Sequence, residues 1–422
     1  MKKSRTYILL FLVIVIAVRL MLIGGVYDWP AFSGVFAVTA AIAMAIFTGR
    51  SERFKGLSYT AWIIAAVTTA MIYPHYFKNW GGINLRDKTL ILVIIQLVMF
   101  GMGTHMRLQD FRGLRTTGKG VLVGLFCHFT VMPLMGLLLI NLFHFDPEIA
   151  AGIILIGSCS SGLASNVMVY LAKGNLVLSV IVTAMATLAA PLLTPLLMKL
   201  LAGTLIEVHF IDMMAEIVKI VLVPIGAALL HDFLKTASRA AEFRVAVAVI
   251  LSLGWIGLVR SGLITSPSGV SRVWELSAFM AGAVVAGFLY HQLWSRWRAL
   301  DNLMPKLSMF GIIYFTLVTT AAGRDNLLAV GGLLFLASII HNSAGYFFGF
   351  WLSRLFGMNR TDSRTIAFEV GLQNGGMASG IAGAMGKLGT VGLAAAVFSP
   401  WMNISGSLLA NWWRQRPVDP DK

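Results

Sequence analysis

A single carboxylate, Glu369, stands inside an apolar stretch with no basic residue near it in the sequence. It belongs to the segment FEVGLQNGG (368–376), and no Lys or Arg occurs within one helical turn of it. An ionised side chain at the depth of a membrane costs about 3 kcal/mol unless a proton, a cation or a base compensates its charge. We therefore expect Glu369 to hold a cation; an ion pair with a distant base such as Lys219 is the alternative.

Neutral oxygen donors accompany this carboxylate at helical spacing. Gln373 lies four residues after Glu369, so the two side chains share a helix face for as long as the helix continues. Ser179 and Thr183 have the same spacing in another apolar run, and the remaining small polar residues of this kind are Ser165, Asn166 and Asn374. Hard cations prefer carboxylate, carbonyl and hydroxyl oxygens, and one carboxylate among neutral oxygens matches a monovalent charge.

Two glycine-containing polar segments interrupt the apolar runs at related places. GSCSSGLAS (157–165) aligns without gaps with GLQNGGMAS (371–379), 214 residues later, and both glycines, the alanine and the serine are identical. Such segments loosen a helix at membrane depth. An odd number of predicted spans separates the copies, so the second copy is inverted. Inverted repeats with discontinuous helices indicate a transporter binding site near the midplane, although glycines also serve simple helix packing.

The elements that position these residues are membrane-spanning helices. The 422 residues are 58% hydrophobic and only 12% charged, with a mean hydropathy of +0.81, which excludes a water-soluble globule. We predict an all-α polytopic membrane protein with about fourteen spans of the length that crosses a bilayer. The expected spans lie near 7–27, 31–48, 59–77, 88–106, 117–143, 149–172, 176–202, 211–231, 243–264, 274–294, 303–322, 327–354, 363–386 and 388–413.

The net charge of +15 is a topology signal rather than an indication of nucleic acid binding. The basic residues gather in alternate connections, for example at Arg107, Arg112, Arg115 and Lys119, at Lys235, Arg239 and Arg244, and at Arg354, Arg360 and Arg364. Because Lys and Arg stay on the cytoplasmic side, both termini are predicted to be cytoplasmic, in a cell inner (plasma) membrane. The two cysteines, Cys127 and Cys159, are too few for a disulfide framework or a zinc site.

Five segments resemble the bile acid:sodium symporters, whose bacterial and plastid relatives carry pantoate, pyruvate and other organic anions. They are MFGMGTHMRLQDF (99–111), GLASNVMVYLAKGNLVLSVIVT (162–183), HNSAGYFFGF (341–350), FEVGLQNGG (368–376) and NISGSLLA (403–410). The resemblance covers about residues 55–234 and 300–415. It implies an inverted-repeat transporter with a core of two crossed discontinuous helices and a panel that moves against it.

The resemblance also implies a division of the chain into four parts. Residues 1–54 form two extra N-terminal spans, and 55–234 form the first repeat, broken near 157–166. Residues 235–299 contain an inserted pair of spans, and 300–422 form the second repeat, broken near 371–379. Both additions are even in number, so they preserve the orientation of the rest.

The same resemblance implies two sodium sites and a substrate site. The first sodium site falls on Ser165, Asn166, Ser179, Thr183 and Glu369. The second falls on Glu369, Val370, Leu372, Gln373 and His128. The substrate residues are Leu163, Asn374, Gly376, Met402 and Asn403.

Three of these positions depart from the family pattern. His128 replaces a glutamine, and it either ligates through a neutral nitrogen, titrates, or is a satisfied core histidine. Leu163 replaces a threonine and Met402 a histidine, so two polar substrate contacts have become apolar. We expect an organic anion with a less polar body than pantoate.

The sequence therefore predicts a sodium-coupled secondary symporter of an organic anion, bile-acid-like or a small monocarboxylate, that works by alternating access. Its expected partners are Na⁺, the anion and the lipid bilayer. Proton coupling through Glu369 and His128 is an alternative, and a membrane sensor that binds without transport is another. No HExxH helix, paired intramembrane aspartates or nucleophile elbow indicates an enzyme.

Overall fold

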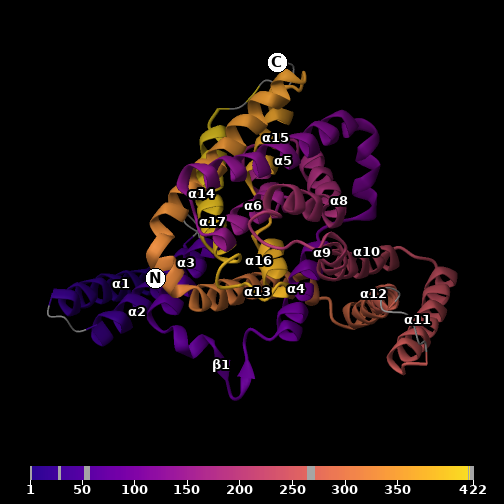
Figure 1. Ribbon diagram of the computed structural model, residues 1–422, viewed down its shortest axis with the longest axis horizontal. Helices are drawn as coiled ribbons and strands as arrows, with labels where there is room; N and C mark the ends of the chain where they lie inside the picture. Colours follow the sequence, from indigo (N-terminus) through magenta and orange to yellow (C-terminus); the bar gives the residue numbers. More distant parts are fainter. Residues whose placement is uncertain (1, 27–29, 52–57, 264–270, 417, 419–422) are drawn as a thin grey trace.

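The computed structural model describes residues 2–26, 30–51, 58–263, 271–416 and 418, and they are almost entirely helical (Figure 1). The first elements are α1 (Lys2–Val26), α2 (Pro30–Arg50), α3 (Ser58–Ile72), η2 (Pro74–Phe77), β1 (Asn79–Trp80), β2 (Ile83–Asn84), α4 (Lys88–Gly103), η3 (Leu108–Gly113), α5 (Leu114–Phe143), α6 (Pro147–Ser158), α7 (Ala164–Leu171) and α8 (Leu176–Ala202). They are followed by α9 (Phe210–Ile217), η4 (Val218–Leu222), α10 (Val223–Lys235), α11 (Arg239–Arg260), α12 (Ser271–Arg296), α13 (Leu300–Ala322), α14 (Arg324–Leu355), α15 (Arg360–Gly371), α16 (Gly375–Ala384) and α17 (Leu393–Arg414).

The predicted polytopic membrane architecture is confirmed. Within the described part of the chain, nine helices are long and apolar enough to cross a membrane, and shorter apolar helices accompany them. The total of about fourteen spans stays a prediction. The span expected at 59–77 ends earlier, at Ile72, because Pro74 cannot donate a backbone hydrogen bond; a short helix and the antiparallel ribbon of β1 and β2 follow.

Both predicted interruptions occur in the structure. The first lies between the end of α6 at Ser158 and the start of α7 at Ala164. The second is shorter than expected, since α15 ends at Gly371 and α16 begins at Gly375, so that Ser379 is helical.

The two interruptions meet and pair with each other at Ser161 and Gln373, and this meeting point is called the crossing below. Ser161 and Gln373 form an antiparallel bridge, in which the Gly162 N–H donates to the Leu372 carbonyl (3.0 Å) and the Asn374 N–H to the Ser160 carbonyl (2.8 Å). Lipid offers no hydrogen-bonding partner to unwound backbone, so each interruption supplies backbone hydrogen bonds that the other would lack. The crossing is thereby fixed in register.

Long helices enclose the crossing. Helix α5 packs against α6, α8 and α15, and α17 packs against α6, α7, α14 and α16. The start of α8 is joined to α15 where the Asn175 backbone N–H donates to Thr365 Oγ1 (2.8 Å) and the Asn175 side chain donates to Asp362 Oδ1 (2.8 Å). Asn175 also caps α8 by accepting from the Leu178 N–H (3.1 Å).

Two helical hairpins lie outside this enclosure, on opposite sides of the molecule in Figure 1. Helices α1 and α2 pack on each other, and α2 packs on α3. Helices α11 and α12 pack on each other, and α12 packs on α10. The second hairpin is joined to the rest by the buried Lys219, whose Nζ contacts Glu216 (3.0 Å) and Glu275 on α12 (2.8 Å). The expected division near residues 54 and 55 lies outside the described residues.

The close approach of α14 to the second interruption gives a stability prediction. A Cβ at Gly345 would lie 2.7 Å from the Gly371 Cα, so Gly345→Ala forces α14 away from α15. We expect a loss of about 1–3 kcal/mol, measured as a lower Tm of the detergent-purified protein. Gly254→Ala on α11 is the control, since nothing lies within 4 Å of its Cβ. Equal Tm values for the two variants would contradict the tight approach.

Candidate functional site

Glu369 lies in the last turn of α15 with its side chain fully buried. Three hydroxyl groups contact its carboxylate: Ser179 Oγ at 2.5 Å, Thr183 Oγ1 at 2.8 Å and Ser161 Oγ at 2.7 Å. The alternative partner Lys219 is paired with Glu216 and Glu275 instead. Within the described part of the chain, no basic side chain pairs with this carboxylate, so the negative charge has only neutral partners.

Further oxygens complete a compact cluster around the carboxylate. Asn166 Oδ1 lies 2.7 Å from Ser179 Oγ and 3.3 Å from Thr183 Oγ1. Ser165 Oγ lies 3.4 Å from Thr183 Oγ1 and donates its own proton to the Gly162 carbonyl at 2.8 Å. The structure thus brings together all five residues expected at the first sodium site, from α7, α8 and α15.

The cluster has more acceptors than protons. The Ser179 hydroxyl has one hydrogen, but both Glu369 Oε1 and Asn166 Oδ1 lie within hydrogen-bonding distance of it. Thr183 is in the same position between Glu369 Oε2 and Asn166 Oδ1. A small cation relieves such a shortage because it accepts lone pairs from several oxygens at once. The donor set therefore fits a hard monovalent cation.

Ser161 is a member of the cluster that the sequence reasoning missed. It lies in the first interruption, in the middle of GSCSSGLAS, and reaches Glu369 Oε2 from α6's side of the crossing. The available signal in the sequence was a serine inside a segment predicted to be unwound. Its contact with Glu369 could not be predicted, because it depends on the pairing of Ser161 with Gln373.

The residues expected at the second cation site lie around the same crossing, and two of their backbone carbonyls already accept a hydrogen bond. The Val370 carbonyl accepts from Gln373 Nε2 (2.7 Å), and the Leu372 carbonyl accepts from the Gly162 N–H (3.0 Å). Gln373 Oε1 is buried without a hydrogen-bonding partner. This side-chain oxygen therefore has both of its lone pairs available to a ligand.

His128 links the two interruptions from α5. Its Nδ1 lies 2.9 Å from the Glu369 carbonyl and its Nε2 lies 2.7 Å from the Cys159 carbonyl, at the ends of α15 and α6. Both ring nitrogens therefore face backbone oxygens rather than Gln373 Oε1. The residue is fully buried and fixes the two half-helix ends relative to each other.

Asn342 and His341 on α14 support the crossing from the other side. The Asn342 side chain donates to the Gly371 carbonyl (2.7 Å), and His341 Nε2 lies 3.0 Å from the Met132 carbonyl on α5. These contacts join α14 to α15 and to α5. The Asn342 contact also satisfies the Gly371 carbonyl, which the second interruption leaves without a helical partner.

The expected substrate residues on α16 lie at the start of this helix. Asn374 caps α16 by accepting from the Met377 N–H (3.0 Å), while its Nδ2 is buried without a partner. A Cβ added at Gly376 would make ordinary van der Waals contacts, since its nearest atoms lie 3.5–3.8 Å away. The first-turn N–H groups of α16 carry partial positive charge. This helix start can therefore accept an anion.

The remaining substrate residues lie around this helix start to different degrees. Met402 on α17 is buried, and its sulfur accepts from the Gln373 N–H at 3.3 Å. Leu163 occupies the N-cap position of α7 without a side-chain hydrogen bond. The Asn403 side chain donates to the Ser399 carbonyl of its own helix (2.8 Å).

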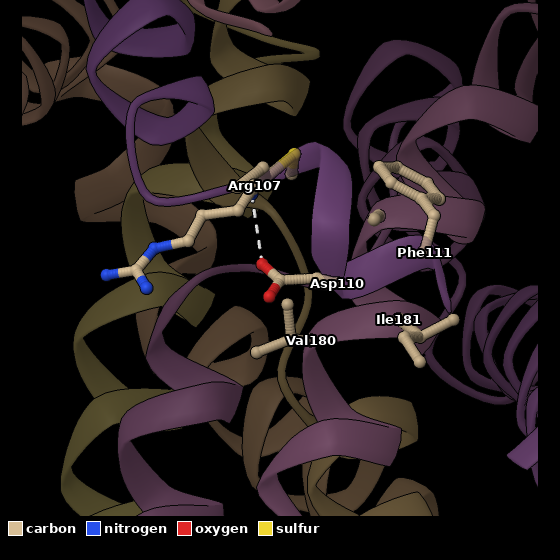
Figure 2. A pocket seen from close by; sticks show the side chains of 7 residues that line it. Arg107, Asp110, Phe111, Val180 and Ile181 are labelled. Atoms are coloured by element: carbon tan, nitrogen blue, oxygen red, sulfur yellow. Dashed lines mark hydrogen bonds between the residues drawn. The ribbon is translucent and has the colours of Figure 1, made fainter. Parts of the chain in front are cut away.

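A narrow recess opens on the neighbouring face of α8 (Figure 2). Asp110 and Phe111 of η3 face Val180 and Ile181, which lie between the site residues Ser179 and Thr183 in the sequence of α8. Asp110 is held there because it accepts from the Arg107 N–H at 3.0 Å. The recess therefore lies where η3 packs on the helix that carries two of the cluster hydroxyls.

Comparison with known proteins identifies the family. A sequence model described as "Sodium Bile acid symporter family" matches residues 91–266. YocS of Bacillus subtilis, a "sodium-dependent transporter", is 31% identical over 86% of this chain and 93% of the relative. The chloroplastic "probable sodium/metabolite cotransporter" BASS1 of Arabidopsis thaliana is 28% identical over 85% of this chain and 73% of the relative. The ileal sodium/bile acid cotransporter of Homo sapiens is 28% identical over 68% of this chain and 67% of the relative.

The predicted resemblance is thus confirmed along most of the chain. The chain belongs to the sodium/bile acid symporter family, whose members are membrane transporters and not enzymes.

Proposed function

We propose that this protein is a sodium-coupled symporter of an organic anion that works by alternating access. The observation that carries the proposal is the buried Glu369 carboxylate, which has neutral oxygens around it and pairs with no basic side chain among the described residues. The names of the relatives, a sodium-dependent transporter and a sodium/bile acid cotransporter, agree with this assignment. Sodium is then a transported ion rather than a resident cofactor.

The coupling follows from the position of the cation between three helices. A cation in the cluster neutralises Glu369 and draws Ser179 and Thr183 of α8 and Asn166 of α7 towards α15. Because α7 and α16 begin at the same crossing, this ordering also fixes the helix starts that face the anion. Each ligand then favours the arrangement that the other requires, which is reciprocal coupling.

The anion site is proposed at the start of α16, between Asn374 and Gly376. The free Asn374 Nδ2 and the first-turn N–H groups supply donors for a carboxylate. Leu163 and Met402 are apolar where the family has polar residues, so they favour a substrate with a less polar body. Both a bile-acid-like molecule and a small monocarboxylate meet these conditions.

The architecture proposed for this cycle is an inverted repeat with core and panel domains. The core contains the two crossed interruptions, and the panel moves against it. The first two spans and the pair near 235–299 are additions to this plan, consistent with their peripheral hairpins. The alternation of basic connections supports a plasma membrane location with both termini cytoplasmic.

The central prediction concerns the charge of Glu369. Glu369→Gln keeps the shape of the side chain but removes the charge that holds the cation. We expect the sodium-induced rise in Tm, measured against potassium, to disappear, with apparent sodium affinity lower by roughly 100-fold or more. Sodium-driven uptake in proteoliposomes should also be lost, measured with radiolabelled pyruvate or cholate, whichever the wild-type protein accumulates.

Glu275→Gln is the matched control, because Lys219 keeps its contact with Glu216. An unchanged sodium response of Glu369→Gln would remove the proposed role. Accumulation driven by a pH gradient without sodium would instead select proton coupling. Substrate binding with no flux under any gradient would select the sensor.

Thr183 gives a graded test of the oxygen cluster. Thr183→Val removes one oxygen without changing the side-chain volume much, so apparent sodium affinity should fall roughly tenfold. Thr187→Val, one turn further along α8, removes a hydroxyl that donates to the Thr183 carbonyl (2.7 Å) and does not contact Glu369. A sodium titration followed by Tm should separate the two; equal losses would place the cation elsewhere.

Gly376 separates anion binding from sodium binding. Gly376→Ala fits the fold, but its methyl group narrows the space at the start of α16. The KM for the transported anion should rise roughly tenfold while the sodium-induced rise in Tm is retained. An unchanged KM would contradict an anion site at the start of α16.

A further inference from the structure

Four donor-bearing rings gather at one end of α10 and α12, away from the crossing. His231 on α10 packs against Tyr290, His291 and Trp294 of α12, with ring-centroid distances of 4.7, 5.4 and 5.2 Å. Figure 1 shows these helices on the side of the molecule that carries the α11–α12 hairpin. None of the four residues belongs to the proposed transport site.

The rings present buried polar atoms that have no partner in the described part of the chain. They are both nitrogens of His231, Nδ1 of His291, the hydroxyl of Tyr290 and Nε1 of Trp294. His231 is only 1% exposed, so water does not replace a missing partner. Unpaired buried groups of this kind destabilise the fold, because they lose their hydrogen bonds to water without replacement. A ligand that supplies partners at this place therefore binds favourably.

The donor chemistry selects an acceptor-rich ligand. The indole Nε1–H of Trp294 can only donate a hydrogen bond, and a neutral imidazole or a tyrosine hydroxyl also offers one proton. Phosphate oxygens accept from all of these groups at once, whereas a metal ion would serve the imidazoles and leave the indole unpaired. The cluster thus fits a phosphate group better than a cation.

The charge at this end of the helices has the matching sign. Arg298 lies 3.6 Å and Lys235 5.2 Å from the Trp294 ring centroid, and both are exposed. Neither forms an ion pair with a carboxylate among the described residues. Segments 231–244 and 290–301 together contain five basic residues against three acidic ones, of which Glu242 and Asp301 act on the two imidazoles at longer range.

The surroundings favour a lipid as the source of the phosphate. Leu289 and Leu293, which neighbour the ring residues along α12, are 54% and 58% exposed, and Phe233 on α10 is 41% exposed. In a membrane protein such side chains contact acyl chains. We propose that the basic end of α10 and α12 binds the phosphodiester headgroup of an anionic phospholipid, with Arg298 and Lys235 over the phosphate and the ring cluster beneath it.

The proposal is tested on the full-length protein, stripped of lipid in detergent and kept in potassium buffer so that the sodium site plays no part. Short-chain phosphatidylglycerol should raise the Tm, while phosphatidylcholine of the same chain length and inorganic phosphate should not. Arg298→Gln should weaken the apparent affinity about fivefold, as should Lys235→Gln. Trp294→Phe, which keeps the ring but removes its donor, should weaken it as well.

Arg416→Gln is the matched control, since Arg416 is also exposed and lies 4.2 Å over a tryptophan ring, that of Trp412. It should leave the affinity unchanged. Equal responses to the two phospholipids, an equal shift with inorganic phosphate, or wild-type affinity in all three variants would overturn the proposal. A rise in Tm with Zn²⁺ that His231→Phe abolishes would overturn it in favour of a metal site.

Discussion

The structure depends on a fully buried carboxylate that no basic side chain pairs with among the described residues. Glu369 is surrounded by hydroxyl and amide oxygens from α7, α8 and the first interruption. In a medium of low polarity, an uncompensated carboxylate would pull the surrounding helices apart or take up a proton. A positive charge held among these oxygens would stabilise the packing of the helices, and in this way the proposed cation is tied to the fold.

The crossing of two unwound segments is the means by which this charge is placed. Each interruption supplies backbone partners for the other, and side chains from α5 and α14 satisfy further carbonyls. Such irregular backbone is tolerated at membrane depth only when protein groups replace water. His128 and Asn342 therefore hold the backbone that places Glu369, although neither contacts its carboxylate.

Much of this arrangement could be predicted from the sequence because its signals are local. Glycine and small polar residues inside apolar runs mark the interruptions, and the spacing of Ser179 and Thr183 places both on one helix face. What escaped prediction depends on contacts between distant segments. Ser161 joins Glu369, and both nitrogens of His128 meet carbonyls, only because the interruptions cross in one particular register. Pro74 was a local signal for the end of α3 at Ile72, but the continuing apolar sequence led to a longer predicted span.

The bridge between Ser161 and Gln373 also constrains how the protein is made. Membrane proteins are inserted as they are synthesised, from the N-terminus onward. The first interruption therefore enters the bilayer long before its partner is translated, with the Ser160 carbonyl and the Gly162 N–H still lacking the groups of α15 and the second interruption that later satisfy them. A nascent chain that stops short of α15 thus leaves these backbone groups without hydrogen-bonding partners inside the membrane.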